Sequence, residues 1–191
     1  PESPIALILH PEPNQGGTMN NKVIFGLYRE FVKRDFSTLR FNFRGVGKSE
    51  GIYDDGEGEL SDAASVLDWL QQYNTNSKIC WVAGFSFGSW VAMQLLMRRP
   101  ELNGFVSISP PANVRDFSFL APCPSSGLIV HGDKDNIASY DSSKILAEKL
   151  QKQKKVDIKF KPVKGADHFY ENYAEEFSNI VDSYIKDSLK S

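Results

Sequence analysis

Residues 79–92 constrain the fold more than any other stretch of the chain. A short apolar run over residues 79–83 stops at Gly84, and apolar side chains at helical spacing follow from Val91 onward. This pattern predicts a strand, a sharp turn and a helix in direct succession. The turn reads Gly84-Phe85-Ser86-Phe87-Gly88 and matches G-x-S-x-G, in which the serine adopts a strained backbone conformation that points its hydroxyl out of the fold.

The pentapeptide is only moderately specific on its own, because Gly and Ser are frequent in turns of every kind. Two interpretations are therefore open: an ordinary strand-to-helix turn, or a turn built to present Ser86. In the second, the flanking glycines have a steric reason, since a side chain at either position would collide with the neighbouring strand or helix. The rest of the chain has to decide between the two.

Apolar runs alternate with helical patterns along the remainder of the chain. The first run, residues 5–9, has no polar alternation, as expected for a strand covered on both faces of a parallel sheet. Further strands are predicted over residues 37–43, 105–108, 128–131 and 156–163, and helices after Asn20 or Asn21, over residues 60–73, 142–150 and 173–189, and between the Ser86 turn and Pro100. Strands separated by helices imply right-handed crossovers. The predicted fold class is α/β, with a mainly parallel sheet and helices on both faces.

Length and composition predict a single domain that binds neither nucleic acid nor a membrane. The chain has 191 residues, of which 41% are hydrophobic, and we expect a single domain over residues 1–191. A net charge of −2 gives no basic excess for nucleic acid, and the lysines of residues 149–161 are interpreted as a solvated face. No apolar run approaches the roughly 18–20 residues that span a bilayer, and no leader is visible. We therefore expect a cytoplasmic protein with no nucleic-acid and no membrane partner.

A serine hydroxyl is a weak nucleophile, so Ser86 would need a neighbouring base and an acid that orients the base. In the hydrolase arrangement built on this turn, the order along the chain is nucleophile, acid, histidine, which makes His168 the candidate base. The acid should follow the strand that ends at His131, where Asp133 and Asp135 are both available. Asp135 is far enough into the loop to turn back to His168, whereas Asp133 is expected to accept backbone N–H bonds.

The oxyanion of an acyl-transfer intermediate needs two backbone donors. One is expected from Phe87, the residue after the serine, at the start of its helix. The second should come from the loop after the first strand, where Pro11 and Pro13 have no N–H, so that the backbone of Glu12 is the nearest donor. Side chains that could bind substrate are Asn14, Gln15, Phe119 and Tyr140, although the two aromatic ones could equally belong to the core.

With these residues in place, the chain resembles the α/β-hydrolase superfamily, and within it the small lidless proteins related to dienelactone hydrolase. The resemblance runs nearly end to end, through the His10-Pro11 loop, residues 43–49, the Ser86 turn, residues 131–135 and residues 165–168. It implies the superfamily's sheet without a lid domain and with most of the first antiparallel hairpin absent.

The same resemblance implies that Ser86, Asp135 and His168 form a catalytic triad. The chain departs from the pattern at one position that bears on substrate preference. Close relatives tend to have a second histidine in the first loop where this chain has Glu12. That carboxylate would place a negative charge near the oxyanion if the side chain turned inward.

Other chemistries have weaker support. The segment Gly45-Val46-Gly47-Lys48-Ser49 ends like a phosphate-binding P-loop, but Asn42 stands where the full pattern needs another glycine. No G-x-G-x-x-G, H-x-x-x-H or C-x-x-C spacing is found, so we expect no cofactor and no metal. The serious rival is a hydrolase-fold protein that binds a small molecule or a partner and does no chemistry.

The sequence therefore predicts a serine hydrolase whose partner is a small-molecule ester. The preferred activity is that of a carboxylesterase on short-chain acyl esters, reached through an acyl-enzyme intermediate. A thioesterase or other acyl hydrolase is the alternative.

Overall fold

A computed structural model describes residues 2–190 and contains one six-stranded sheet. The strand order is β2-β1-β3-β4-β5-β6, and every pairing among these residues is parallel. The strands are β1 (Ile5–Leu9), β2 (Ser37–Arg40), β3 (Cys80–Phe85), β4 (Gly104–Ile108), β5 (Gly127–Gly132) and β6 (Ile158–Val163). The predicted α/β class, with a mainly parallel sheet, is confirmed.

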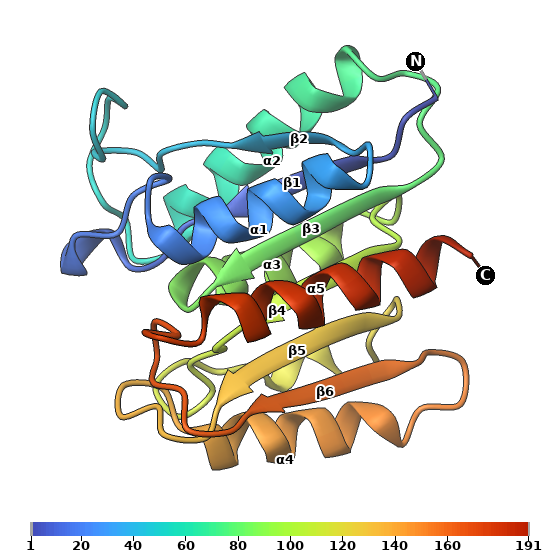
Figure 1. Cartoon of the computed structure of the whole chain (residues 1–191). Coiled ribbons are helices and arrows are strands. Elements are labelled where there is room, and N and C mark those ends of the chain that lie inside the picture. The colour runs from blue at the N-terminus through green and yellow to red at the C-terminus, as the bar shows by residue number, and fades with distance from the viewer. Residues whose placement is uncertain (1, 191) are drawn as a thin grey trace.

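Helices cover both faces of the sheet (Figure 1). One face carries α1 (Lys22–Lys33) and α5 (Ala174–Leu189). The other carries α2 (Glu57–Gln72), α3 (Phe87–Arg98) and α4 (Tyr140–Gln151), and two short 3-10 helices, η1 (Pro13–Gln15) and η2 (Ser118–Leu120), lie in connections. No helix in residues 2–190 is long and apolar enough to cross a membrane.

The two faces of the sheet give two separate cores because side chains alternate along a strand. In β1, Ile5, Leu7 and Leu9 belong to the core under α2, α3 and α4, whereas Ala6 and Ile8 belong to the core under α1 and α5. All five side chains are buried. Burial on both faces explains why this strand reads as a continuous apolar run.

Among the element boundaries that differ from the sequence-based prediction, three have a clear local cause. The second strand ends at Arg40, before residue 43, because the Phe43 N–H donates to His10 Nε2 and not to a sheet neighbour. Helix α2 begins three residues early because the Glu59 carboxylate accepts the N–H groups of Asp54 and Gly56. Helix α4 begins two residues early because the Ser139 hydroxyl caps it by accepting the Ser142 N–H.

The connection between β4 and β5 is where a lid would enter. In the described chain it contains only η2, a helix of three residues. The connection therefore contains no lid domain, in agreement with the resemblance to lidless hydrolases.

Candidate active site

Ser86 occupies the strained turn that the pentapeptide predicts. It lies between β3 and α3 at φ 55° and ψ −119°, a conformation that costs a non-glycine residue about 1–3 kcal/mol. Its backbone N–H donates to the carbonyl oxygen of Ile108 at 2.9 Å. A Cβ at Gly84 would collide with the carbonyl oxygen of Gly88, and one at Gly88 with that of Leu9. The steric reason for both glycines is therefore present in the fold.

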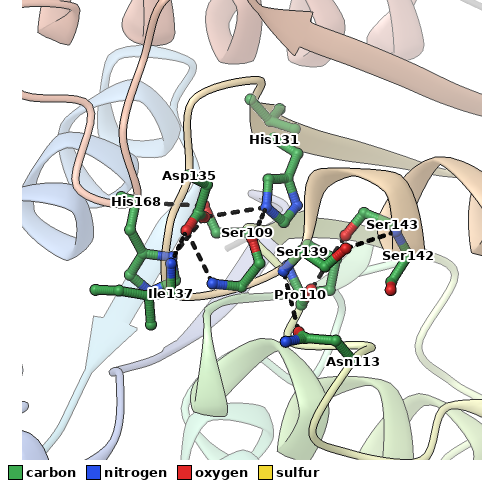
Figure 2. A network of polar contacts seen from close by, with 12 residues as sticks. Ser109, Pro110, Asn113, His131, Asp135, Ile137, Ser139, Ser142, Ser143 and His168 are labelled. Atoms are coloured by element: carbon green, nitrogen blue, oxygen red, sulfur yellow. Dashed lines mark hydrogen bonds and ion pairs between the residues drawn. The ribbon is translucent and has the colours of Figure 1, made fainter.

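His168 and Asp135 are brought together although 33 residues separate them (Figure 2). His168 Nδ1 lies 2.7 Å from Asp135 Oδ2, and both side chains are almost wholly buried. Asp135 Oδ1 accepts the N–H groups of Ile137 and Ala138, each at 2.8 Å. Because Nδ1 faces a carboxylate oxygen, it carries the ring proton, and Nε2 is left with its lone pair free to accept another.

The Asp135 carboxylate remains ionised in this buried setting. Burial acts to raise its pKa, but hydrogen bonds from His131, His168 and the Ile137 N–H outweigh burial and hold the pKa below its usual range. An ionised partner stabilises the imidazolium that forms whenever His168 takes up a proton.

Ser86 and His168 lie at the same edge of the sheet. The Phe85 ring, adjacent to Ser86, lies 5.0 Å from the His168 ring between centroids. The carbonyl that binds the Ser86 N–H belongs to Ile108, and the next residue, Ser109, donates its hydroxyl to the His168 carbonyl oxygen at 3.4 Å. Ser86 and His168 are thus both tied to the end of β4, through the carbonyl oxygen of Ile108 and the hydroxyl of Ser109.

The two backbone groups predicted as oxyanion donors also lie near this edge. Phe87 is the first residue of α3, where an N–H has no partner within the helix. Glu12 precedes η1 and uses its carbonyl oxygen to accept the N–H groups of Gln15 and Gly17. The close approach of Gly88 to the carbonyl oxygens of Leu9 and His10 brings the start of α3 against the end of β1.

The Glu12 side chain has a cationic partner that the sequence did not reveal. Arg115 Nη2 lies 3.4 Å from Glu12 Oε2, and Arg115 Nη1 donates to Asp55 at 2.8 Å. The same guanidinium lies over the Trp90 ring at 4.5 Å and the Phe87 ring at 5.5 Å. This guanidinium lies between two carboxylates, so it offsets part of the negative charge anticipated beside the oxyanion position. No local motif could indicate this pairing, because 103 residues separate Glu12 from Arg115.

The other predicted residues are more dispersed. Asn14 and Gln15 are exposed on η1. Phe119 stacks on Phe117 at 6.1 Å beside the core under α3. Tyr140 packs against the rings of His131 at 6.0 Å and Phe160 at 5.7 Å, so it lies behind the Asp135 loop and against β6. In the described structure, none of these four has a side-chain hydrogen bond or ring contact with Ser86 or His168.

Asp133 has the backbone role that its position suggested. Its Oδ1 accepts the Gly165 N–H at 2.7 Å, which ties the loop after β5 to the loop after β6. A hollow of about 1350 Å³ lies elsewhere, between α5 and the sheet, with Trp81, Lys159 and Tyr184 in its lining. Its lining includes none of the candidate residues.

His10 is a buried histidine that holds the first loop in place. Its Nδ1–H donates to the Pro11 carbonyl oxygen at 2.8 Å, and its Nε2 accepts the Phe43 N–H at 3.0 Å. Burial lowers its pKa to about 4, although the bond to Pro11 acts in the opposite direction. The neutral ring is the form that makes both bonds.

We expect the stability of the fold to depend on this neutral ring. The unfolded chain takes up a proton on His10 near pH 6.5 and the folded chain only near pH 4, so stability is fully present above pH 6.5 and falls between those values. The shift corresponds to about 3 kcal/mol. Denaturant unfolding of the wild type and of His10→Gln between pH 7.5 and 4.5 measures it. Equal losses of stability in the two proteins would contradict the assignment.

The parallel sheet, the strained serine turn and the histidine–aspartate pair define the class of protein as an α/β-hydrolase. The chain belongs to the family described as X-Pro dipeptidyl-peptidase (S15 family), which matches residues 2–184. The resemblance to the α/β-hydrolase superfamily is thereby confirmed.

Solved structures agree with this assignment. A protein of unknown function from Agrobacterium tumefaciens, described as an α/β-hydrolase, is 53% identical over 99% of this chain and 87% of its own, with a TM-score of 0.96. An α/β serine hydrolase homologue from Coxiella burnetii is 33% identical over 95% and 84%, with a TM-score of 0.88. A lidless α/β serine hydrolase from Xanthomonas campestris is 29% identical over 97% and 84%, with a TM-score of 0.85.

Proposed function

We propose that this protein is a serine hydrolase, and within that class a carboxylesterase acting on small short-chain acyl esters. The observation that carries the proposal is the 2.7 Å contact between His168 Nδ1 and Asp135 Oδ2 at the sheet edge where Ser86 occupies a strained turn. Ser86 is the nucleophile, His168 the base and Asp135 the acid that orients the base. The serine hydrolases among the similar structures support the class.

The proposed reaction proceeds in two halves. Ser86 Oγ attacks the ester carbonyl carbon while His168 Nε2 takes the hydroxyl proton, and the oxyanion accepts the N–H groups of Phe87 and Glu12. One such donor contributes about 3 kcal/mol to transition-state stabilisation. The imidazolium then gives its proton to the departing alcohol as the C–O bond breaks. Water, deprotonated by His168, hydrolyses the acyl-enzyme through the same steps.

A fluorophosphonate probe tests the class. This probe reacts with a serine only when a base activates it, so it should label Ser86 in the wild type and fail to label Ser86→Ala. Peptide mapping of the adduct identifies the modified residue. A protein that only binds small molecules would remain unlabelled, and that result would reject the enzyme in favour of the binding protein.

A substrate panel tests the bond that is cleaved. The panel contains nitrophenyl esters of graded length, matched thioesters, and a dipeptidyl nitroanilide with proline before the scissile amide, because the family's name gives that bond. We expect the largest kcat/KM on the oxygen esters. If a thioester or the prolyl amide had the largest kcat/KM, the proposed activity would change to thioesterase or peptidase. The serine mechanism would still hold.

The enzyme is expected to prefer short acyl chains. Between β4 and β5 the described chain offers only η2 as cover, so an acyl tail finds little apolar surface beyond its first carbons. Each buried methylene contributes roughly 0.8 kcal/mol, so kcat/KM should rise with length only while the tail stays in contact. We expect a maximum between acetyl and butyryl nitrophenyl esters. A steady rise to long chains, or a jump in rate on micelle formation, would indicate a deep or covered acyl site.

A further inference from the structure

His131 is a buried histidine that the proposed reaction leaves without a role. It lies near the end of β5, and its side chain has no exposed surface. Its Nδ1 is buried without a hydrogen-bond partner in the part of the chain that the structure describes. An apolar side chain would fill the same space without leaving a polar atom unpaired, so packing alone does not explain an imidazole there.

The other ring nitrogen of His131 faces two acceptors (Figure 2). His131 Nε2 lies 2.9 Å from the Ala138 carbonyl oxygen and 3.0 Å from Asp135 Oδ2. Because neither atom can donate, Nε2 carries the hydrogen. This hydrogen bridges the carboxylate and the backbone of the loop that the same carboxylate holds through its bonds to the Ile137 and Ala138 N–H groups.

The Asp135 carboxylate is therefore surrounded by donors. Oδ1 receives two backbone N–H groups, and Oδ2 faces the nitrogens of both His131 and His168. His131 belongs to a strand in the interior of the sheet, whereas Asp135 and His168 belong to loops. The contact with His131 consequently anchors the carboxylate to an interior strand of the sheet.

We propose that His131 is a positioning residue, which fixes Asp135 Oδ2 in line with His168 Nδ1 and shares the negative charge of that oxygen. The inference rests on the proposed function. Sharing the charge makes Oδ2 a weaker proton acceptor, so the proton stays on Nδ1 when His168 is charged.

Few other titratable groups face this pair. The Tyr140 ring on α4 lies against His131, and the Tyr170 hydroxyl, buried after β6, bonds to Ser109 and to the Val130 carbonyl oxygen. Asp135 and Asp167 act electrostatically on Tyr170 and help, after burial, to raise its pKa. Neither tyrosine has a hydrogen bond to the Asp135 carboxylate in the described structure. If the His131 donor is removed, neither tyrosine is therefore placed to donate a hydrogen bond to Oδ2 instead.

The variant His131→Phe removes the donor and keeps a ring. We expect kcat to fall about tenfold to a hundredfold with little change in KM. Losses of this size are typical when a residue that orients an active-site group through a hydrogen bond is removed. The acid limb of the pH profile of kcat/KM should move to higher pH, because a carboxylate without this donor stabilises the charged form of the neighbouring imidazole more strongly. His131→Gln restores an N–H at the same distance along the side chain and should return both values towards the wild type.

Ser143→Ala is the matched control. Its hydroxyl is buried and donates to the Pro110 carbonyl oxygen at 3.1 Å, behind the same loop but without contact with Asp135. The Ser143→Ala variant should be less stable than the wild type, and the acid limb of its pH profile of kcat/KM should not move. A His131→Phe protein with wild-type kcat and an unmoved limb would overturn the proposal, as would a Ser143→Ala protein with the same shift.

A measurement on the wild type keeps the proposal testable if His131→Phe does not fold. Nitrogen-15 NMR of labelled histidine reports which ring nitrogen bears hydrogen, and His131 Nε2 should bear it throughout pH 6 to 8. An Nε2 without hydrogen would overturn the proposal. A wild type that fluorophosphonate leaves unlabelled would instead refute the serine mechanism, so the two failures are distinguishable.

Discussion

Ser86→Ala is expected to lower ester hydrolysis by about 10³- to 10⁶-fold while leaving the fold intact. The loss is large because no other group replaces the nucleophile at the turn. His168→Ala should be nearly as damaging, since the hydroxyl and the imidazole act as one unit. The measurement is steady-state kinetics on a short-chain nitrophenyl ester, with each rate expressed per mass of purified protein.

Thermal unfolding is the control for both variants. The Ser86 hydroxyl makes no hydrogen bond among the side-chain contacts of residues 2–190, so its loss should alter stability by less than about 0.5 kcal/mol. The strained backbone conformation is compatible with Ala to the same degree as with Ser. Residual activity above a tenth of the wild type in either variant would remove Ser86 and His168 from the proposed triad.

Asp135→Asn is expected to lower kcat by about 10²- to 10⁴-fold. The asparagine oxygen would stay with the Ile137 and Ala138 N–H groups, because only an acceptor fits there. Its NH₂ group would then face His168 Nδ1 and force the ring proton onto Nε2. An imidazole with hydrogen on Nε2 cannot accept the proton of Ser86.

Asp133→Asn is the matched variant from the same loop. An amide oxygen can still accept the Gly165 N–H that Asp133 Oδ1 accepts at 2.7 Å, so the loss is that of a charge-assisted bond, about 1 kcal/mol of stability. Turnover should change by less than about threefold, because this side chain does not contact His168. The reverse pattern, with Asp133→Asn inactive and Asp135→Asn active, would exchange the two assignments.

The sequence itself determined those parts of this protein that depend on local backbone geometry. A tight strand-to-helix turn needs glycine where the backbone comes close, so Gly84 and Gly88 already identified the turn and its serine. Continuous apolar runs identified the buried parallel strands, and β1 follows the predicted bounds. Chain order and loop position in the sequence favoured Asp135 over Asp133 as the acid.

The tertiary structure alone decided which distant side chains meet. The second strand is shorter than its apolar pattern because His10, far along the chain, takes the Phe43 N–H. Arg115 contacts Glu12 across 103 residues, and His168 contacts Asp135 across 33 residues. Contacts of this kind depend on the spacing and twist of the whole sheet, which brings the carboxyl ends of its strands to one edge. The spacing of neighbouring residues along the chain therefore does not predict them.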